Sequence, residues 1–221
     1  MHDGRTFSST AELEVGMEIH RNRVALAIFA VTLIAASHTV KGDPKHPVLH
    51  PSGFGMHSYA AWKAQQGLTD SSGAKNQALY FQKDTLTANF AAGVATIDGF
   101  EGTPTSELGE LAFWYRKDGH CGAGAPRFNV RVEVAPGAPR QTIFFGCNSG
   151  MVATNTALDS QGRLWERRST GNLLTLLPAG TITSLAIIYD EGEEFPPGFV
   201  YLDNVQVGSK IWTSAADNAN E

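Results

Sequence analysis

The segment from Phe113 to Arg116 has the residue types best suited to binding a ligand. Side chains of an extended strand alternate between two faces, so Trp114 and Arg116 share a face opposite to Phe113 and Tyr115. If Phe113 faces a core, the indole of Trp114 stands outward. It could then stack on a sugar ring, with Arg116 as a hydrogen-bond donor. If the strand is buried on both faces, all three aromatic residues belong to the core. We take Trp114 and Arg116 as the candidate ligand-binding pair.

Catalytic motifs give no comparable signal. Ser72–Lys75 has the S-x-x-K spacing of penicillin-recognising enzymes but lacks their partner motifs, and Gly146–Gly150 has its serine one place too late for a nucleophile elbow. Four carboxylates in Asp190–Glu194 form either a solvated turn or part of a calcium site, because calcium prefers oxygen ligands. We therefore assign no catalytic residue, although a site assembled from distant loops would leave no motif.

An apolar run, Val24–Ala36, follows Arg21 and Arg23 and ends at small residues. The run is too short for a membrane span of about 20 residues, and its flanks are those of a secretory signal peptide. Met17 is the better start of this unit. We interpret residues 17–37 as the signal peptide and residues 1–16 as an upstream extension. The expected location is secreted, either extracellular or periplasmic.

Two cysteines, Cys121 and Cys147, are the only ones in the chain. Export places them in an oxidising compartment, where paired cysteines form disulfides, so we predict a Cys121–Cys147 bond. The alternative is metal binding with the adjoining His120. Adjacent ligands rarely reach one tetrahedral ion, and no fourth ligand has typical spacing.

Composition narrows the class of protein. The net charge is −5, so the broad basic surface of a nucleic-acid-binding protein is absent. The charged fraction is 18%, with 23 glycines, which argues against a coiled coil or a charged disordered chain. No second long apolar run follows the leader, so we expect no membrane span after its removal.

Short strand-like runs separated by Gly- and Pro-rich turns fill the rest of the sequence. The clearest has Phe128, Val130, Val132 and Val134 alternating with polar residues, which is typical of a strand with one buried face. Other expected strands are 77–82, 94–97, 108–116, 142–146, 173–177, 182–189 and 199–207, with one or two helical turns at 58–66. This pattern predicts an all-β fold, an antiparallel β-sandwich of the jelly-roll type. We expect residues 38–55 to form a flexible N-terminal arm, residues 56–212 the single sandwich domain and residues 213–221 a disordered tail.

Two of these strands carry a resemblance. Val200–Val207, with Asp-Asn in an apolar strand, and Asn76–Phe81 look like the closing and early strands of jelly-roll carbohydrate-binding modules and galactose-binding-like domains. The resemblance implies that Asp203 helps to hold a structural calcium ion. Asp118–Pro126 and Phe199–Val207 also resemble a group of uncharacterised exported bacterial proteins, which implies no function.

Taken together, these features predict an exported, non-catalytic binding module for a glycan or another cell-envelope ligand. Two alternatives remain. One is a hydrolase or lyase on the same scaffold, and the other is a purely structural surface protein.

Overall fold

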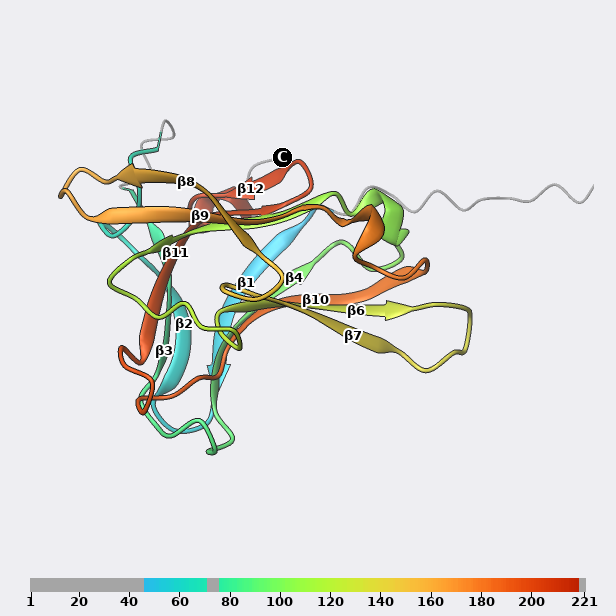
Figure 1. Ribbon diagram of the computed structural model, residues 1–221, viewed down its shortest axis with the longest axis horizontal. Helices are drawn as coiled ribbons and strands as arrows, with labels where there is room; N and C mark the ends of the chain where they lie inside the picture. Colours follow the sequence, from blue (N-terminus) through green and yellow to red (C-terminus); the bar gives the residue numbers. More distant parts are fainter. Residues whose placement is uncertain (1–45, 71–75, 219–221) are drawn as a thin grey trace, which may run out of the picture. The chain divides into compact units, whose positions relative to one another are not determined.

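Two antiparallel sheets lie face to face in a computed structural model that describes residues 46–70 and 76–218 (Figure 1). The smaller sheet has, in spatial order, β1 (Val48–Phe54), β4 (Ala92–Asp98), β10 (Thr181–Tyr189), β6 (Arg127–Glu133) and β7 (Gln141–Gly146). The larger sheet has β2 (Ser58–Lys63), β3 (Ala78–Lys83), β11 (Phe199–Val207), β5 (Glu110–Arg116), β9 (Leu164–Asn172) and β8 (Val152–Leu158), with β12 (Lys210–Trp212) beside β11. Every pairing between these strands is antiparallel. The predicted all-β sandwich is confirmed, while its jelly-roll connectivity stays a prediction.

The core between the sheets is built by strands with one buried face. Phe128, Val130 and Val132 are fully buried, as their alternation predicts, while Arg131 is exposed. β10 lies in the middle of its sheet, as predicted, and its side chains alternate between buried positions and positions that are partly or fully exposed. The prediction for Val134 is wrong: its side chain is 39% exposed, because β6 ends at Glu133 and the chain turns there.

The predicted disulfide is present. Cys121 and Cys147 are bonded, with their Cα atoms 5.3 Å apart, and the bond joins the segments that enter β6 and leave β7. It therefore cross-links the base of the β6–β7 hairpin next to the core.

The first strand corrects the predicted N-terminal arm. Residues 48–54 form β1, which pairs with β4 along its whole length and buries Leu49. Pro51 lies within this strand, which is tolerated because β1 is the edge of its sheet and an edge strand can lack one backbone donor. Residues 1–45, which include the predicted extension, leader and start of the arm, lie outside the described residues.

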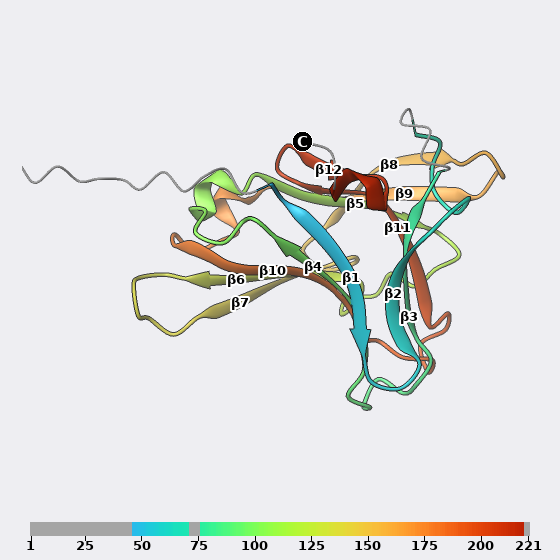
Figure 2. The same ribbon diagram turned by 180° about the vertical axis from the view of Figure 1, so that it is seen from behind.

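The predicted disordered tail is corrected for residues 213–218, while residues 219–221 lie outside the described residues. After β12, the chain forms a 3-10 turn, η3 (Ala215–Asn218). The Asn218 side chain accepts a hydrogen bond from the backbone N–H of Leu49 (2.9 Å) and donates one to the Leu49 carbonyl (2.7 Å). This contact joins the last turn of the sandwich to its first strand (Figure 2).

Two further segments differ from expectation. The expected helical turns at 58–66 are the strand β2, because Ala60 faces the core while Tyr59 and Ala61 face away. The expected strand at 173–177 is instead the 3-10 turn η2 (Leu173–Thr175), capped by the Asn172 side chain. A third 3-10 turn, η1 (Thr105–Glu107), precedes β5 and contacts η2.

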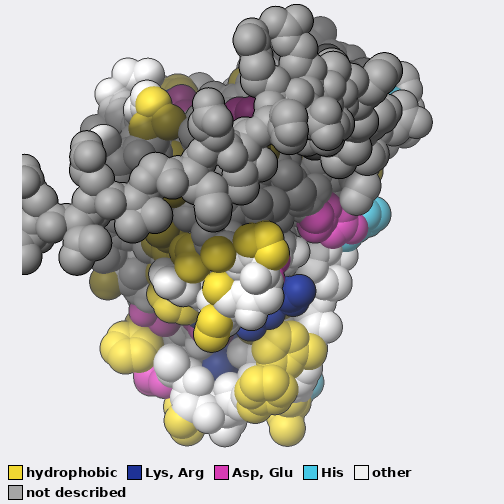
Figure 3. All heavy atoms as spheres, turned by 90° about the vertical axis from the view of Figure 1, so that its right-hand side faces the viewer, with side chains coloured by type: hydrophobic (Ala, Val, Ile, Leu, Met, Phe, Trp, Pro, Cys, Tyr) yellow, Lys and Arg dark blue, Asp and Glu magenta, His cyan; other side chains and the backbone are white. Residues whose placement is uncertain are grey.

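Three connections meet at one end of the sandwich: the β1–β2 turn, the β3–β4 loop and the β10–β11 loop (Figures 1 and 2). Hydrogen bonds join them, such as Thr87 N–H to the Glu194 carboxylate (2.6 Å) and Gly192 N–H to the Thr87 hydroxyl (2.7 Å). Large apolar side chains are exposed here, and Phe90 is 90% exposed. Hydrophobic side chains accordingly gather on the lower part of the view in Figure 3.

Candidate functional site

Four aromatic rings form a platform on the outer face of the larger sheet. Ala60, Phe81, Val200 and Leu202 belong to the core, so their strand neighbours must point to the opposite face. Those neighbours are Tyr59 of β2, Tyr80 of β3, and Phe199 and Tyr201 of β11. β2, β3 and β11 are adjacent in the sheet, which brings residues far apart in sequence side by side. We call these four residues the aromatic platform.

The platform rings contact one another at tilted and edge-on angles. The Tyr80 ring is central: its centroid lies 4.7 Å from that of Tyr201, 5.7 Å from Tyr59 and 6.1 Å from Phe199. These separations lie in the favourable range for aromatic pairs. Tyr59 is 37% exposed and the other three rings are half-buried, so part of each ring remains open to solvent.

Polar groups border the platform. The Tyr80 hydroxyl donates to Gln82 Oε1 (2.8 Å), and the Gln82 amide donates to Asp84. Burial, with a smaller contribution from neighbouring tyrosines, raises the pKa of Tyr80 to about 12, so its phenol stays neutral at physiological pH. Lys63 Nζ lies 5.4 Å from the Tyr59 ring centroid and 5.7 Å from that of Tyr80. An ammonium at this distance is attracted to ring faces.

Arg116, one of the two residues predicted to bind a ligand, adjoins this platform. Its guanidinium carbon lies 3.7 Å from the Tyr201 ring centroid. Its Nε donates to Asp118 (2.6 Å), and Nη1 donates to Gln66 (2.8 Å). Only 5% of Arg116 is exposed, so its guanidinium packs on the Tyr201 ring and has little contact with solvent.

Trp114, the other predicted residue, lies on the same outer face as Arg116, as the alternation requires. Phe113 and Tyr115 face the core. The Trp114 ring is half-buried and packs against a second apolar cluster of Leu68, Ala78 and Trp165. Trp114 and Arg116 therefore lie on the same face of the sheet as the aromatic platform. The segment that contains Leu68 packs against Trp114 and covers part of this face.

Asp203 is buried under that same segment. Its Oδ2 accepts a hydrogen bond from Leu68 N–H (2.7 Å) and its Oδ1 from Asn204 N–H (2.6 Å). Burial raises the pKa of Asp203 to about 7 against the effect of these two bonds, and the charge of Asp70 raises it further. Asp70 is thus a nearby second carboxylate. Among the described residues, no group of three or more His, Cys, Asp or Glu side chains could hold a metal, so a calcium ion here would need backbone or water ligands.

A separate polar cluster anchors the loop that contains the disulfide. The His120 ring pairs with the Glu191 carboxylate, which also accepts from Gly124 N–H (3.1 Å). Arg127 makes a bidentate contact with Asp190, at 2.5 and 2.7 Å. The first two carboxylates of the acidic segment 190–194, those of Asp190 and Glu191, therefore anchor this loop. Its fourth, Glu194, binds Thr87 N–H.

The residues of the aromatic platform are not among those predicted from sequence to bind a ligand. Tyr80 and Tyr201 each stand alone between core residues, and nothing in the sequence shows that β3 and β11 are neighbours. Their alternation with Phe81 and Leu202 was a usable signal for outward-facing rings, but combining them required the strand order.

Within the described residues, no helix is long and apolar enough to cross a membrane. A disulfide-bonded sandwich is compatible with an extracellular or periplasmic protein. Comparison of the whole chain with protein-family models, curated proteins and solved structures found no match.

Proposed function

We propose that this chain is an exported, non-catalytic binding module that holds a glycan, or another cell-envelope ligand, on the aromatic platform. The observation that carries the proposal is the gathering of Tyr59, Tyr80, Phe199 and Tyr201 on one open sheet face. Solvent-facing aromatic groups with a polar border are a common feature of binding surfaces.

The chemistry of the platform suits a sugar. The C–H groups on one face of a pyranose ring are weakly positive and pack well on the negative face of an aromatic ring. The hydroxyls at the edge of the sugar need partners, and Lys63 and Gln82 border the platform with donors. Gln82 is oriented by Tyr80 and Asp84, which lowers the entropic cost of using it in a complex.

The state of the polar groups on this outer face also favours binding over catalysis. Its titratable groups are mostly engaged: Arg116 with Asp118 and Gln66, and Tyr80 with Gln82. A hydrolase or lyase would instead need acid and base groups that are free to act on a substrate in a cleft, and the groups named here already have hydrogen-bond partners.

The test is a glycan-array screen of the purified full chain, with and without calcium, followed by calorimetric titration of the best ligand. We expect Tyr59→Ala to weaken binding about tenfold, which corresponds to the loss of about 1.4 kcal/mol of stacking. Tyr59→Phe should bind normally, because it retains the ring.

The matched control is Phe144→Ala. Phe144 is an exposed aromatic residue on β7 of the other sheet, so its loss should leave the affinity unchanged. Equal effects of Tyr59→Ala and Phe144→Ala would refute binding at the platform. Turnover of a polysaccharide or ester in the same screen would instead favour the enzyme alternative.

A further inference from the structure

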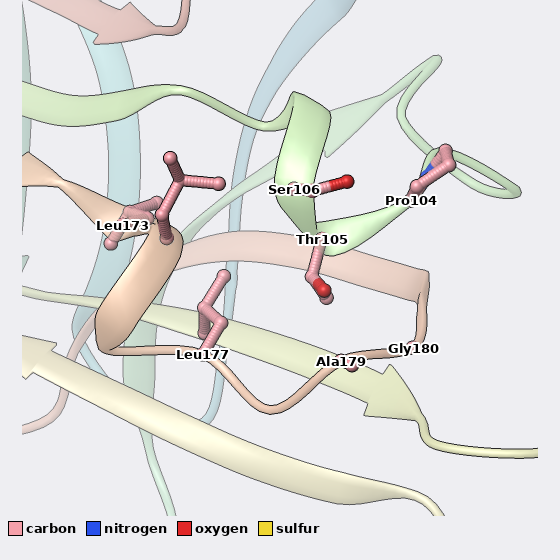
Figure 4. A pocket seen from close by; sticks show the side chains of 8 residues that line it. Pro104, Thr105, Ser106, Leu173, Leu177, Ala179 and Gly180 are labelled. Atoms are coloured by element: carbon pink, nitrogen blue, oxygen red, sulfur yellow. The ribbon is translucent and has the colours of Figure 1, made fainter.

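A groove separate from the aromatic platform lies between η1 and η2. Its inner part is a hollow of about 240 Å³ lined mainly by apolar side chains, with Leu173, Leu177 and Pro104 among them (Figure 4). An adjoining hollow of about 510 Å³ is lined by polar residues, including Glu107, Glu110 and Asn172. Ser106 and Leu174 line both hollows, so the two form one groove with an apolar end and an acidic end.

The walls of the groove are fixed by hydrogen bonds between its two sides. Thr105 N–H donates to the Gly180 carbonyl (2.9 Å), and the Thr105 hydroxyl donates to the Pro178 carbonyl (2.9 Å). On the opposite side, the N–H groups of Leu176 and Leu177 both donate to the Leu173 carbonyl. The hollow is therefore formed before any ligand arrives, which is usual for small-molecule sites.

The size and lining of the inner hollow define the apolar part of a ligand. An apolar cavity of about 150 Å³ is large enough to hold a benzene molecule. The hollow here is larger, so it fits a phenyl ring with a short alkyl extension. The Thr105 hydroxyl is already bonded to Pro178, so the ring would not leave that donor unpaired.

The outer hollow defines the polar part. Glu110 is occupied, because its carboxylate accepts from Arg167 (3.1 Å) and from the Ser169 hydroxyl. Glu107 is exposed, and its carboxylate makes no hydrogen bond or ion pair with any residue of the described ranges 46–70 and 76–218. An unneutralised carboxylate beside an apolar hollow selects a cationic head group.

We propose that this groove binds a small amphiphilic amine, with its ring or short alkyl chain in the apolar hollow and its ammonium group at Glu107. This site is independent of the aromatic platform, since the two share no residue. A neutral or anionic compound of the same shape should bind more weakly, because the carboxylate of Glu107 would gain no charge partner or would be repelled.

The test is an NMR titration of the full chain with phenethylamine, phenethyl alcohol and 3-phenylpropanoate. We expect saturable shifts confined to residues 104–110 and 171–180, with the amine binding at least about fivefold more tightly than either analogue. Glu107→Gln should remove that preference and leave the alcohol unaffected. Shifts spread over the surface, or equal affinities for the three compounds, would overturn the proposal.

Two neighbouring leucines supply the matched control for the apolar end. Leu174 and Leu176 are 59% and 45% exposed, but only Leu174 lines the groove. Leu174→Ala should weaken phenethylamine binding several-fold, whereas Leu176→Ala should not. Because both side chains are exposed, neither change should unfold the chain, and equal effects of the two would refute the assigned position of the ring.

Discussion

The carboxyl group of Asp203 should make the stability of the fold depend on pH, and replacing Asp203 by Asn should remove that dependence. Burial raises the pKa of Asp203 in the folded chain to about 7, from an ordinary value of 3.8. Between these two values, the folded protein binds a proton that the unfolded chain releases. The free energy of unfolding contributed by this group therefore falls as pH rises from about 4 to about 7 and is constant above that range.

The size of the effect follows from the same two values. Each unit of difference corresponds to about 1.4 kcal/mol, so the full change is about 4 kcal/mol. The amide of the Asp203→Asn variant cannot titrate, so the stability of that variant should lack this component. Above about pH 7, where Asp203 is ionised, the variant also lacks one of the two carboxylate oxygens that accept from Leu68 N–H and Asn204 N–H.

The assay is urea unfolding of both proteins at a series of pH values from about 4 to about 8, analysed as the difference between their unfolding free energies. Glu193→Gln is the control, since Glu193 is an exposed carboxylate of the β10–β11 loop. Its unfolding free energy should stay within about 0.5 kcal/mol of the native value, as is usual for an exposed substitution. Parallel pH curves for the native chain and Asp203→Asn would refute the raised pKa, as would direct NMR titration of Asp203 near its ordinary value.

Four other predictions concern particular residues. Val132→Ala should cost about 1–3 kcal/mol of stability by leaving a cavity, whereas Val134→Ala should cost less than about 0.5 kcal/mol in the same denaturant assay; equal costs would contradict the assigned end of β6. Cys121→Ser should lower the unfolding free energy by roughly 3 kcal/mol in the chain-entropy picture, and mass spectrometry of unreduced native protein should show no free thiol. Trp114→Ala should lower the melting temperature as well as ligand affinity, because the ring packs against the cluster of Leu68, Ala78 and Trp165; an unchanged melting temperature with lost binding would make Trp114 a residue that contacts the ligand alone. Calcium at Asp203 stays a prediction: added calcium should raise the melting temperature of the native chain but not of Asp203→Asn, and no rise in either would exclude the site.

The strands that sequence predicts best are those with a single buried face. β6 is the clearest case, because each of its core residues alternates with a polar one. β8 was missed for the opposite reason. It lies at the edge of the larger sheet, and nearly all its side chains are exposed, so Val152–Leu158 has no apolar period to detect.

The candidate site was less predictable than the fold. Arg116 illustrates the limit: its outward face follows from alternation, but its burial depends on Tyr201 and Gln66, which are distant in sequence. Lys83 is a similar case. Its ammonium is buried and donates to the carbonyls of Thr87, Asn89 and Asp190, so it secures two loops from inside. Such partners are set by loop paths, which local sequence patterns do not specify.

The contact between Asn218 and Leu49 has a consequence for biogenesis. β1 is the first strand of the sandwich, yet its backbone is tied to the turn that ends the described chain. In a chain that is synthesised from its N-terminus, β1 can pair with β4 early, but the two hydrogen bonds at Leu49 form only after Asn218 has been added. We expect the sandwich to close fully only after residues 215–218 have been synthesised, so that the first strand waits for the segment that follows β12.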